Sequence, residues 1–331
     1  MMSVLPFSPF PCREGAWGVR FACLLAAAYS LHLLAADAPP LPPTVADGAK
    51  LTEVYADHRW FEGPSWDPKT HKLYFTSYTK KNQQMLRLDA PGKITVWWDH
   101  TEDINGSWIA RDGRMLCAQC AAHKILSAKI GANGPEDVKV LYEDPKLYQP
   151  NDVREAPNGD IYFTDPNFET KTGGAVYLLK PDGKASKIIT EMTLPNGIIV
   201  SLDGKTLYAS DSGQKNWRAY PIKDDGTVGD GKIFFKPDTD AKGDPDGMTI
   251  DEEGNLYCTG CGGVWYLKPD GKGDYAAPAC LIPFKDLTSN VAFGGDDGKT
   301  LYITCGDKVY SIAMTVRGGL WKLLPELFKT K

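Results

Sequence analysis

Residues 195–211 read PNGIIVSLDGKTLYASD and contain the three parts from which most of this chain is built. The amide of Asn196 stands beside Gly197, the turn Asp203-Gly204 follows, and a run of strand-forming residues ends the stretch. Asp-Gly turns supply the positive φ that tight hairpins require, and runs rich in β-branched and aromatic residues favour strands. The stretch therefore predicts a β-hairpin that begins at an oxygen-bearing side chain.

This unit recurs along the chain. Strand-forming runs like that at 205–211 also occur at 72–76, 160–165 and 299–304. Sites of the Asn196-Gly197 type occur six times, 43 to 50 residues apart: Glu62-Gly63, Asn105-Gly106, Asn151-Asp152, Asn196-Gly197, Asp246-Gly247 and Asn290-Val291. A repeat of this length with several short strands per unit is typical of a β-propeller. We expect an all-β, six-bladed β-propeller over residues 51–318, with one oxygen-bearing side chain per blade at the same position.

The two ends of the repeat region predict how the ring closes. The last unit lacks an outer strand after residues 308–313, and residues 51–56 have no partner in their own unit. We expect residues 51–56 to supply the missing strand and close the ring, which would remove two open sheet edges. The tail at 319–331 is amphipathic and predicts a surface helix.

The N-terminus has the pattern of a secretory signal peptide. Arg13 and Arg20 precede the apolar run 21–36, and small residues follow it. We expect residues 1–38 to be removed, the protein to be exported to the periplasm or secreted, and residues 39–50 to form an exposed lead-in. An uncleaved membrane anchor is the alternative; after cleavage no membrane association is expected.

Charge and cysteine content narrow the function classes. The formal net charge is −5 and no basic run occurs, which argues against a nucleic-acid partner. Six cysteines follow the signal peptide, and in an exported chain they favour disulfides. We expect Cys117–Cys120, Cys258–Cys261 and Cys280–Cys305, with buried thiols as the alternative. A four-thiolate zinc site is disfavoured because the two C-x-x-C pairs would lie on opposite sides of the ring.

The remaining candidate chemistry is that of oxygen ligands. The chain has no G-x-S-x-G elbow, no phosphate-binding glycine loop and no H-E-x-x-H motif, and its five histidines are scattered. Glu62 and Asp246 offer carboxylates, whereas Asn151 and Asn196 offer amide oxygens, a set that suits hard cations such as Ca²⁺. A single Asn or Asp beside Gly is most often a turn residue or strand cap. The repetition of oxygen donors in six units favours a shared site.

Six local strings, in order and at blade spacing, resemble one family over residues 58–313. They are Glu62-Gly63-Pro64-Ser65-Trp66, Pro150-Asn151-Asp152-Val153, Phe163-Thr164-Asp165-Pro166, Pro195-Asn196-Gly197-Ile198, Pro245-Asp246-Gly247-Met248 and Asn290-Val291-Ala292-Phe293-Gly294-Gly295. They are similar to the senescence marker protein/regucalcin and gluconolactonase-like six-bladed propellers. The resemblance implies one divalent cation, Ca²⁺ first and Zn²⁺, Mn²⁺ or Mg²⁺ as alternatives.

The resemblance also implies roles for single residues. Glu62, Asn151, Asn196 and Asp246 would be the metal ligands, and Asp246 would also be the general base. Asn105 and Asn290 would line the cavity and contact substrate or water. Gln149 stands where some members carry a substrate-binding Arg, and Gln119-Cys120 stands where close relatives often carry a Glu-His pair. These two departures predict a different substrate preference.

Three functions follow as hypotheses. The first is a metal-dependent lactonase that opens a small-molecule sugar lactone to its hydroxy acid. The second is a phosphotriesterase with the same metal site, and the third is a non-catalytic binding propeller with a structural calcium. An Asp of ordinary pKa near 4 is a weak base at neutral pH, so the first hypothesis assigns most of the activation to the cation.

Two further groups of residues are interpreted as structural. Six tryptophans are expected to pack between blades: Trp60, Trp97, Trp98, Trp108, Trp217 and Trp265. Asp165 and Asp211, at the ends of equivalent strands, are expected to cap those strands, with reach into the cavity as the alternative.

Overall fold

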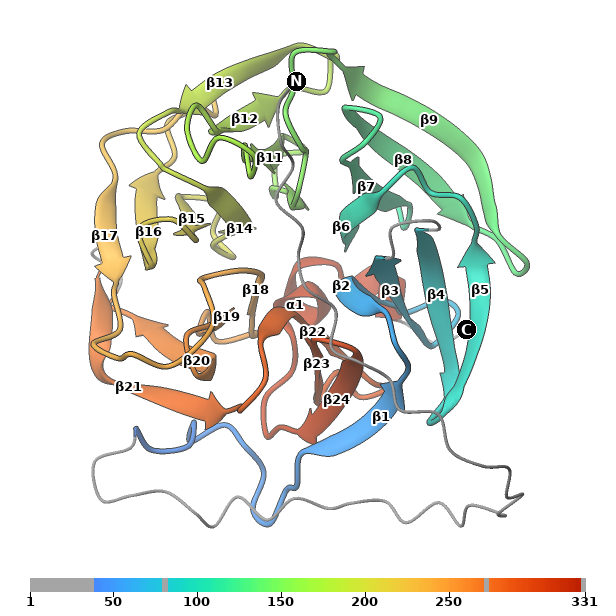
Figure 1. Ribbon diagram of the computed structural model, residues 1–331, viewed down its shortest axis with the longest axis vertical. Coiled ribbons are helices and arrows are strands. Elements are labelled where there is room, and N and C mark those ends of the chain that lie inside the picture. Colours follow the sequence, from blue (N-terminus) through green and yellow to red (C-terminus); the bar gives the residue numbers. More distant parts are fainter. Residues whose placement is uncertain (1–38, 79–82, 271–273, 329–331) are drawn as a thin grey trace, which may run out of the picture.

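The computed structural model describes residues 39–78, 83–270 and 274–328 and shows six four-stranded antiparallel sheets around one axis (Figure 1). The predicted six-bladed β-propeller is therefore confirmed. The predicted signal peptide, residues 1–38, lies outside the described residues. Within the described part of the chain, no helix has the length and apolar character needed to cross a membrane.

The strands follow the chain around the ring, and each blade begins with its innermost strand. In chain order they are β1 (Thr52–Ala56), β2 (Trp60–Asp67), β3 (Lys72–Tyr78), β4 (Gln84–Ala90), β5 (Lys93–Trp98), β6 (Ile104–Ile109), β7 (Met115–Gln119), β8 (Lys124–Ile130), β9 (Pro135–Glu143), β10 (Val153–Glu155), β11 (Ile161–Asp165), β12 (Ala175–Leu179), β13 (Ala185–Ile189), β14 (Pro195–Val200), β15 (Thr206–Asp211), β16 (Asn216–Pro221), β17 (Lys232–Phe235), β18 (Met248–Ile250), β19 (Leu256–Gly260), β20 (Gly263–Pro269), β21 (Tyr275–Pro283), β22 (Thr288–Gly294), β23 (Thr300–Cys305) and β24 (Lys308–Ala313). Blades 1 to 5 are β2–β5, β6–β9, β10–β13, β14–β17 and β18–β21.

The sixth blade combines the two ends of the repeat region. Its sheet has the order β1-β24-β23-β22, and β1 pairs antiparallel with β24, with Thr52 opposite Ser311. The segment before β1, predicted to be an exposed lead-in, contains both exposed and buried residues. Thr44 is buried and its hydroxyl shares a 2.7 Å hydrogen bond with Tyr257 of blade 5. Residues 39–50 therefore pack against the ring.

Neighbouring blades are joined at the axis by a belt of six hydrogen bonds. In each, a hydroxyl or thiol reaches a backbone carbonyl of the next blade over 2.6 to 2.8 Å. The pairs are Thr76 to Asn105, Cys120 to Pro150, Thr164 to Asn196, Ser212 to Pro245, Thr259 to Ser289 and Ser289 to Phe61. Every acceptor is either one of the six repeated site residues or the residue just before one. The belt therefore fixes the height of all six sites around the axis.

The glycine after several site residues allows this close approach. A Cβ on Gly63 would lie inside van der Waals contact with the carbonyl oxygen of Asn105 in blade 2. A Cβ on Gly197 would meet the carbonyl oxygen of Asp246 in blade 5 in the same way. The Glu62-Gly63 and Asn196-Gly197 pairs therefore arise because backbones of adjacent blades touch beside the site residue, and only glycine leaves room for that contact.

The cysteines do not form the predicted disulfides. Cys117, Cys120, Cys258, Cys261 and Cys305 are buried free thiols, so none of the three expected bridges is present. Cys117 and Cys258 pack in apolar cores, whereas the Cys120 thiol donates to the Pro150 carbonyl as the second member of the belt. The C-x-x-C spacing therefore results from one core position and one turn position, which face different surroundings.

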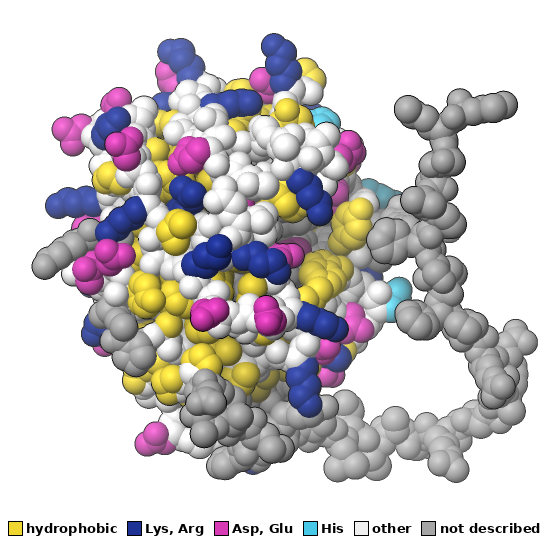
Figure 2. Space-filling model, turned by 60° about the vertical axis from the view of Figure 1, so that its left-hand side comes forward, with side chains coloured by type: hydrophobic (Ala, Val, Ile, Leu, Met, Phe, Trp, Pro, Cys, Tyr) yellow, Lys and Arg dark blue, Asp and Glu magenta, His cyan; other side chains and the backbone are white. Residues whose placement is uncertain are grey.

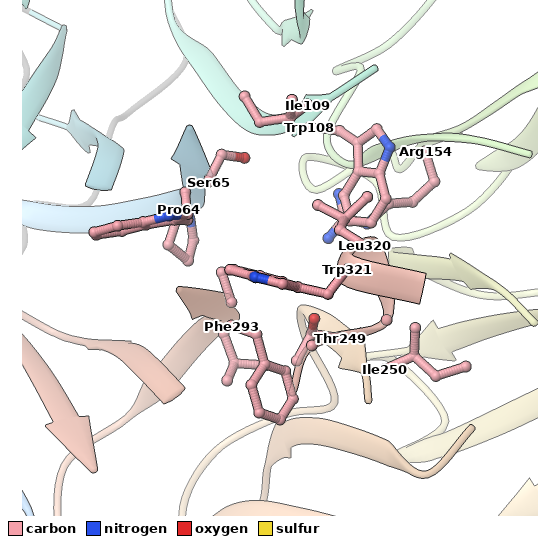
Figure 3. Close-up of a pocket in the computed structure, with 15 residues that line it drawn as sticks. Pro64, Ser65, Trp108, Ile109, Arg154, Thr249, Ile250, Phe293, Leu320 and Trp321 are labelled. Atoms are coloured by element: carbon pink, nitrogen blue, oxygen red, sulfur yellow. The ribbon is translucent and has the colours of Figure 1, made fainter. Parts of the chain in front are cut away.

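The C-terminal tail is a cap on the ring rather than a free surface helix. It forms a short helix α1 (Gly319–Leu323) and a 3-10 turn η1 (Pro325–Phe328), and α1 lies close to the ring axis (Figure 1). Leu320 and Trp321 share a small pocket with Trp66 of blade 1 and Phe293 of blade 6 (Figure 3). Trp66 and Phe293 lie at the C-terminal ends of the inner strands β2 and β22. The tail therefore covers the end of the ring opposite the repeated site residues.

The close approach of the inner strands predicts a large penalty for Gly63→Ala. Gly92→Ala is the matched control, because Gly92 also has positive φ (73° against 49° for Gly63) but has no atom within 4 Å of the place that a Cβ would occupy. The control is expected to lose about 1–2 kcal/mol of unfolding free energy from backbone strain alone. Gly63→Ala should lose about 3 kcal/mol more through overpacking, measured by urea denaturation. Equal losses in the two variants would contradict the proposed contact.

The thiol assignments predict the outcome of alkylation. Burial raises the pKa of the Cys117 and Cys258 thiols, so both should resist iodoacetamide in the folded protein. After unfolding without reductant, peptide mapping should find Cys117, Cys120, Cys258, Cys261 and Cys305 all alkylated. A Cys117–Cys120 or Cys258–Cys261 peptide still cross-linked at that stage would contradict the structure.

Candidate functional site

The six repeated site residues all lie at the N-terminal ends of the innermost strands. Glu62, Asn105, Asn196 and Asn290 lie in β2, β6, β14 and β22, at irregularities where the pairing with the next strand shifts. Asn151 and Asp246 stand two residues before β10 and β18. Irregular pairing at the start of a strand turns side chains away from the sheet face. Here it brings the six residues to one end of the ring.

A cavity of about 540 Å³ opens at this end of the ring, and most of the predicted site residues line it. Its walls include Glu62, Asn105, Asn151, Asn196 and Asp246. All four predicted metal ligands therefore face one hollow. Their shared location follows from the repeat, whereas the role of each remains a prediction.

Gln149 and Asn290 are not among the residues that line the cavity. The Gln149 side-chain oxygen accepts a 3.1 Å hydrogen bond from the backbone N–H of Phe168, which does line it. The Asn290 amide donates to Asp152 Oδ1 at 3.4 Å, and its oxygen accepts from the Val291 N–H at 2.9 Å. Gln149 therefore supports the wall, and Asn290 lies behind the ligands.

Two carboxylates hold the loops that precede the site residues Asn151 and Asn196. Asp165 accepts hydrogen bonds of 2.8 Å from the backbone N–H groups of Tyr148 and Gln149, just before Asn151. Asp211 accepts from the N–H groups of residues 193 and 194, just before Asn196, and from those of residues 213 and 214. Asp211 therefore caps the end of its own strand, as predicted, whereas the hydrogen bonds of Asp165 hold the loop before Asn151. Each of the two carboxylates thus fixes the position of a site asparagine.

The amide of Asn196 is oriented with its oxygen free. Its Nδ2 donates to the Ser212 hydroxyl at 3.1 Å, and Ser212 donates in turn to the Pro245 carbonyl at 2.6 Å. Asn196 Oδ1 is buried and has no hydrogen-bond partner. A buried acceptor without a donor costs free energy unless something else binds it. Asn196 Oδ1 thus presents an unused lone pair at the cavity wall.

The site also concentrates negative charge. Burial, and then the charge of Asp152, raise the pKa of Glu62 above its ordinary value. Burial, and then the charges of Glu62 and Asp152, raise the pKa of Asp246 well above the ordinary range. The ordinary Asp pKa assumed from the sequence is therefore wrong for this carboxyl group. Three carboxylates that repel one another in a desolvated place provide a strong electrostatic preference for a cation.

Sequence reasoning missed Asp152 and Arg154, which lie directly behind the ligands. Asp152 is fully buried and Arg154 is 3% exposed, and the Arg154 Nη2 lies 3.7 Å from Asp152 Oδ2. In the sequence Asp152 reads as the small residue that follows the site position, and Arg154 reads as a strand residue. Only their burial beside Glu62 and Asp246 shows that they belong to the site.

The rim of the cavity carries aromatic and cationic side chains. Trp60, predicted to pack between blades, is 37% exposed and lines the hollow, with its indole N–H 3.5 Å from Glu62 Oε1. Phe168, Lys171 and Lys215 complete this rim, and Lys215 pairs with Asp244 at 3.0 Å. Trp97, Trp217 and Trp265 are buried as predicted. An indole beside a polar cavity can stack on the apolar face of a sugar ring.

The donor set fits a hard divalent cation. Two carboxylates and two amides face one hollow, one amide oxygen is unpartnered, and the surroundings are net negative. Oxygen-only ligation with irregular geometry is what Ca²⁺ accepts. Within the described residues, no cluster of three or more His, Cys, Asp and Glu side chains has metal-binding geometry. Any cation here must therefore use the asparagine oxygens as well.

The sequence of this propeller matches the family model described as the SMP-30/gluconolactonase/LRE-like region over residues 60–307. This chain belongs to that family. The matched range runs from β2 to the turn before β24 and so contains all six site residues. On the face shown in Figure 2, Lys and Arg side chains are interspersed with Asp and Glu, so the net charge of −5 is not gathered there.

Similar proteins are known in several organisms. A gluconolactonase of Zymomonas mobilis is 28% identical over 307 residues, which cover 82% of this chain and 84% of that protein. A solved putative gluconolactonase superposes with a TM-score of 0.74 at 24% identity, covering 85% and 98% of the two chains. Regucalcin of Agrobacterium tumefaciens, described as a calcium-binding protein, superposes with a TM-score of 0.64 at 22% identity over 80% and 96% of the chains. The two structural likenesses support the shared fold.

Proposed function

We propose that this protein is a metal-dependent lactonase that opens a sugar lactone to its hydroxy acid. The observation that carries the proposal is the single cavity in which Glu62, Asn151, Asn196 and Asp246 face an open hollow of sugar size. Membership of a family that includes gluconolactonases, and the similarity to the Zymomonas mobilis enzyme, support the same reaction class.

Glu62, Asn151, Asn196 and Asp246 would hold the cation. When bound, a divalent cation supplies a Lewis acid that polarises a carbonyl and stabilises the charge developing on its oxygen. Ca²⁺ is the preferred identity because all four donors are oxygens and because the related Agrobacterium propeller is described as calcium-binding. Zn²⁺, Mn²⁺ and Mg²⁺ remain alternatives for the same donors.

Asp246 is the proposed proton acceptor. It keeps part of its surface open to the cavity, so a carboxylate oxygen can meet a water that approaches the lactone carbonyl. Burial and the neighbouring carboxylates raise the pKa of Asp246, which would oppose the lowering of that pKa by a bound cation. Asp246 would take a proton from the water that attacks the carbonyl carbon, and would return it to the ring oxygen as the acyl carbon–oxygen bond breaks, so that the ring oxygen leaves as the hydroxyl of the hydroxy acid.

The other wall residues would bind and orient the sugar. Asn105 lines the same hollow and offers its amide to the ring hydroxyls. Trp60 offers an exposed indole next to Glu62, and Lys215 stands on the opposite loop. At the far end of the ring, Leu320 and Trp321 of the tail close the pocket under the inner strands (Figure 3).

The first test is the metal dependence of lactone hydrolysis. Ring opening of glucono-1,5-lactone, followed in a pH-stat, should fall at least about a hundredfold with chelator and return with Ca²⁺. Parallel assays should show little turnover of an aryl phosphotriester. Full activity in excess chelator would contradict the proposal. Tight Ca²⁺ binding without turnover of any lactone in a panel would favour the non-catalytic propeller instead.

The second test concerns Asp246. Asp246→Asn should lower kcat by about a hundredfold or more, because loss of a general base typically costs that much. The control is Asp182→Asn, which alters an exposed turn far from the cavity. Calorimetric titration with Ca²⁺ would separate the two roles, since a variant that still binds the cation yet loses kcat has lost the proton acceptor. An unchanged kcat in Asp246→Asn would contradict the assigned role.

A further inference from the structure

Arg154 crosses the ring axis beneath the proposed cation site. From blade 3 its Nη1 donates to the Ser107 carbonyl of blade 2 at 3.3 Å and to the Val153 carbonyl at 2.7 Å. Its Nη2 donates to the Met248 carbonyl of blade 5 at 3.2 Å. The guanidinium lies 4.8 Å from the ring of Trp108, and Figure 3 shows the two side chains together. Arg154 is therefore held on several sides and does not reach the cavity.

Arg154 is also the buried cation closest to the site's carboxylates. Of the described Lys and Arg side chains, two are buried, and the other, Arg114, pairs with Asp137 on the outer strand β9 at 3.0 Å. The Arg154 Nη2 lies 3.7 Å from Asp152 Oδ2, an oxygen with no hydrogen-bond partner of its own. Because no direct hydrogen bond joins Arg154 to Asp152, the guanidinium acts on this carboxylate mainly through the electrostatic interaction between their charges.

The net charge of the buried groups near the axis can be counted from three carboxyl groups and one guanidinium group. With a cation bound, the carboxylates of Glu62, Asp152 and Asp246 would together contribute three negative charges, and the Arg154 guanidinium, 3.7 Å from Asp152, contributes one positive charge. Asp152 belongs to the same group because its Oδ1 accepts from Asn290 and because it lies, together with the backbone of the predicted ligand Asn151, against Gly106 of the neighbouring inner strand. The resulting net charge of minus two is equal in magnitude and opposite in sign to the charge of a divalent cation.

We propose that Arg154 sets the charge selectivity of this site, by reducing three buried carboxylates to the net charge that a divalent cation neutralises. The inference rests on the proposed cation site and adds a residue that touches neither the cation nor the substrate. Arg154 is thus a positioning residue that acts through the electrostatic field. Without it the site would carry an uncompensated charge and would favour trivalent over divalent ions.

The test is the ratio of La³⁺ to Ca²⁺ affinity, measured by calorimetric titration at one fixed pH. Four full-length proteins are compared: wild type, Arg154→Met, Asp152→Asn and the double variant. In the low dielectric of a buried site, one unit of charge should change this ratio by about tenfold or more. The ratio should rise in Arg154→Met, fall in Asp152→Asn, and return to within about threefold of wild type in the double variant, which restores the net charge.

A purely structural role for Arg154 gives a different pattern. It predicts that both affinities fall together in Arg154→Met and that the double variant is worse than either single variant; either result would overturn the proposal. Arg154→Lys keeps the charge and should keep the wild-type ratio even if its thermal stability falls. If Arg154→Met does not fold, the fall in Asp152→Asn and the unchanged ratio in Arg154→Lys still decide.

The wild-type titration separates this inference from the proposed function. If wild type binds neither ion, the cation site fails and the inference is overturned with it. If wild type binds Ca²⁺ and hydrolyses lactones in a Ca²⁺-dependent way, but the ratio is the same in all variants, the proposed function stands and only the role of Arg154 is rejected.

Discussion

The backbone-to-backbone contact of the inner strands at the axis is the constraint on which the site depends. The belt of side-chain hydrogen bonds, from Thr76 round to Ser289, ties each blade to the carbonyl beside the next site residue. Gly63 and Gly197 permit the contact because they have no Cβ. In a ring closed in this way, all of the site residues lie at the same level along the axis. Positions 43 to 50 residues apart in the chain therefore meet around a single cavity.

This constraint has an electrostatic consequence. Packing the inner strands this tightly removes water from Glu62 and Asp152 and part of the water from Asp246. Three carboxylates in such a place are costly unless protonated or paired with a cation. The fold compensates partly through Arg154 and leaves the rest open. The destabilisation stored there is what a bound cation would relieve, so cation binding and stability of the ring should be coupled.

Much of the fold and part of the site could be predicted from the sequence. The period of the repeat and its turn residues were enough to predict the six blades. The oxygen-bearing side chain in each repeat was enough to predict that Glu62, Asn151, Asn196 and Asp246 lie around one cavity. Local pattern could not supply the rest. Whether Trp60 packs between blades or lines the cavity depends on which side of the strand end it occupies. The predicted disulfides were wrong because the two cysteines of each C-x-x-C pair face different surroundings. Arg154 acts across the axis on residues about 90 positions away, and spacing alone carries no information about such contacts.

We propose that the axial contact builds one divalent cation site from four oxygen donors. The most direct measurement is anomalous diffraction from crystals grown with Mn²⁺ and, in parallel, with Ca²⁺. We expect a single strong peak at the axis, within bonding distance of side-chain oxygens of Glu62, Asn151, Asn196 and Asp246 and with at least one coordination position open to the cavity. A peak elsewhere, or a fully protein-enclosed ion with no open position, would contradict it.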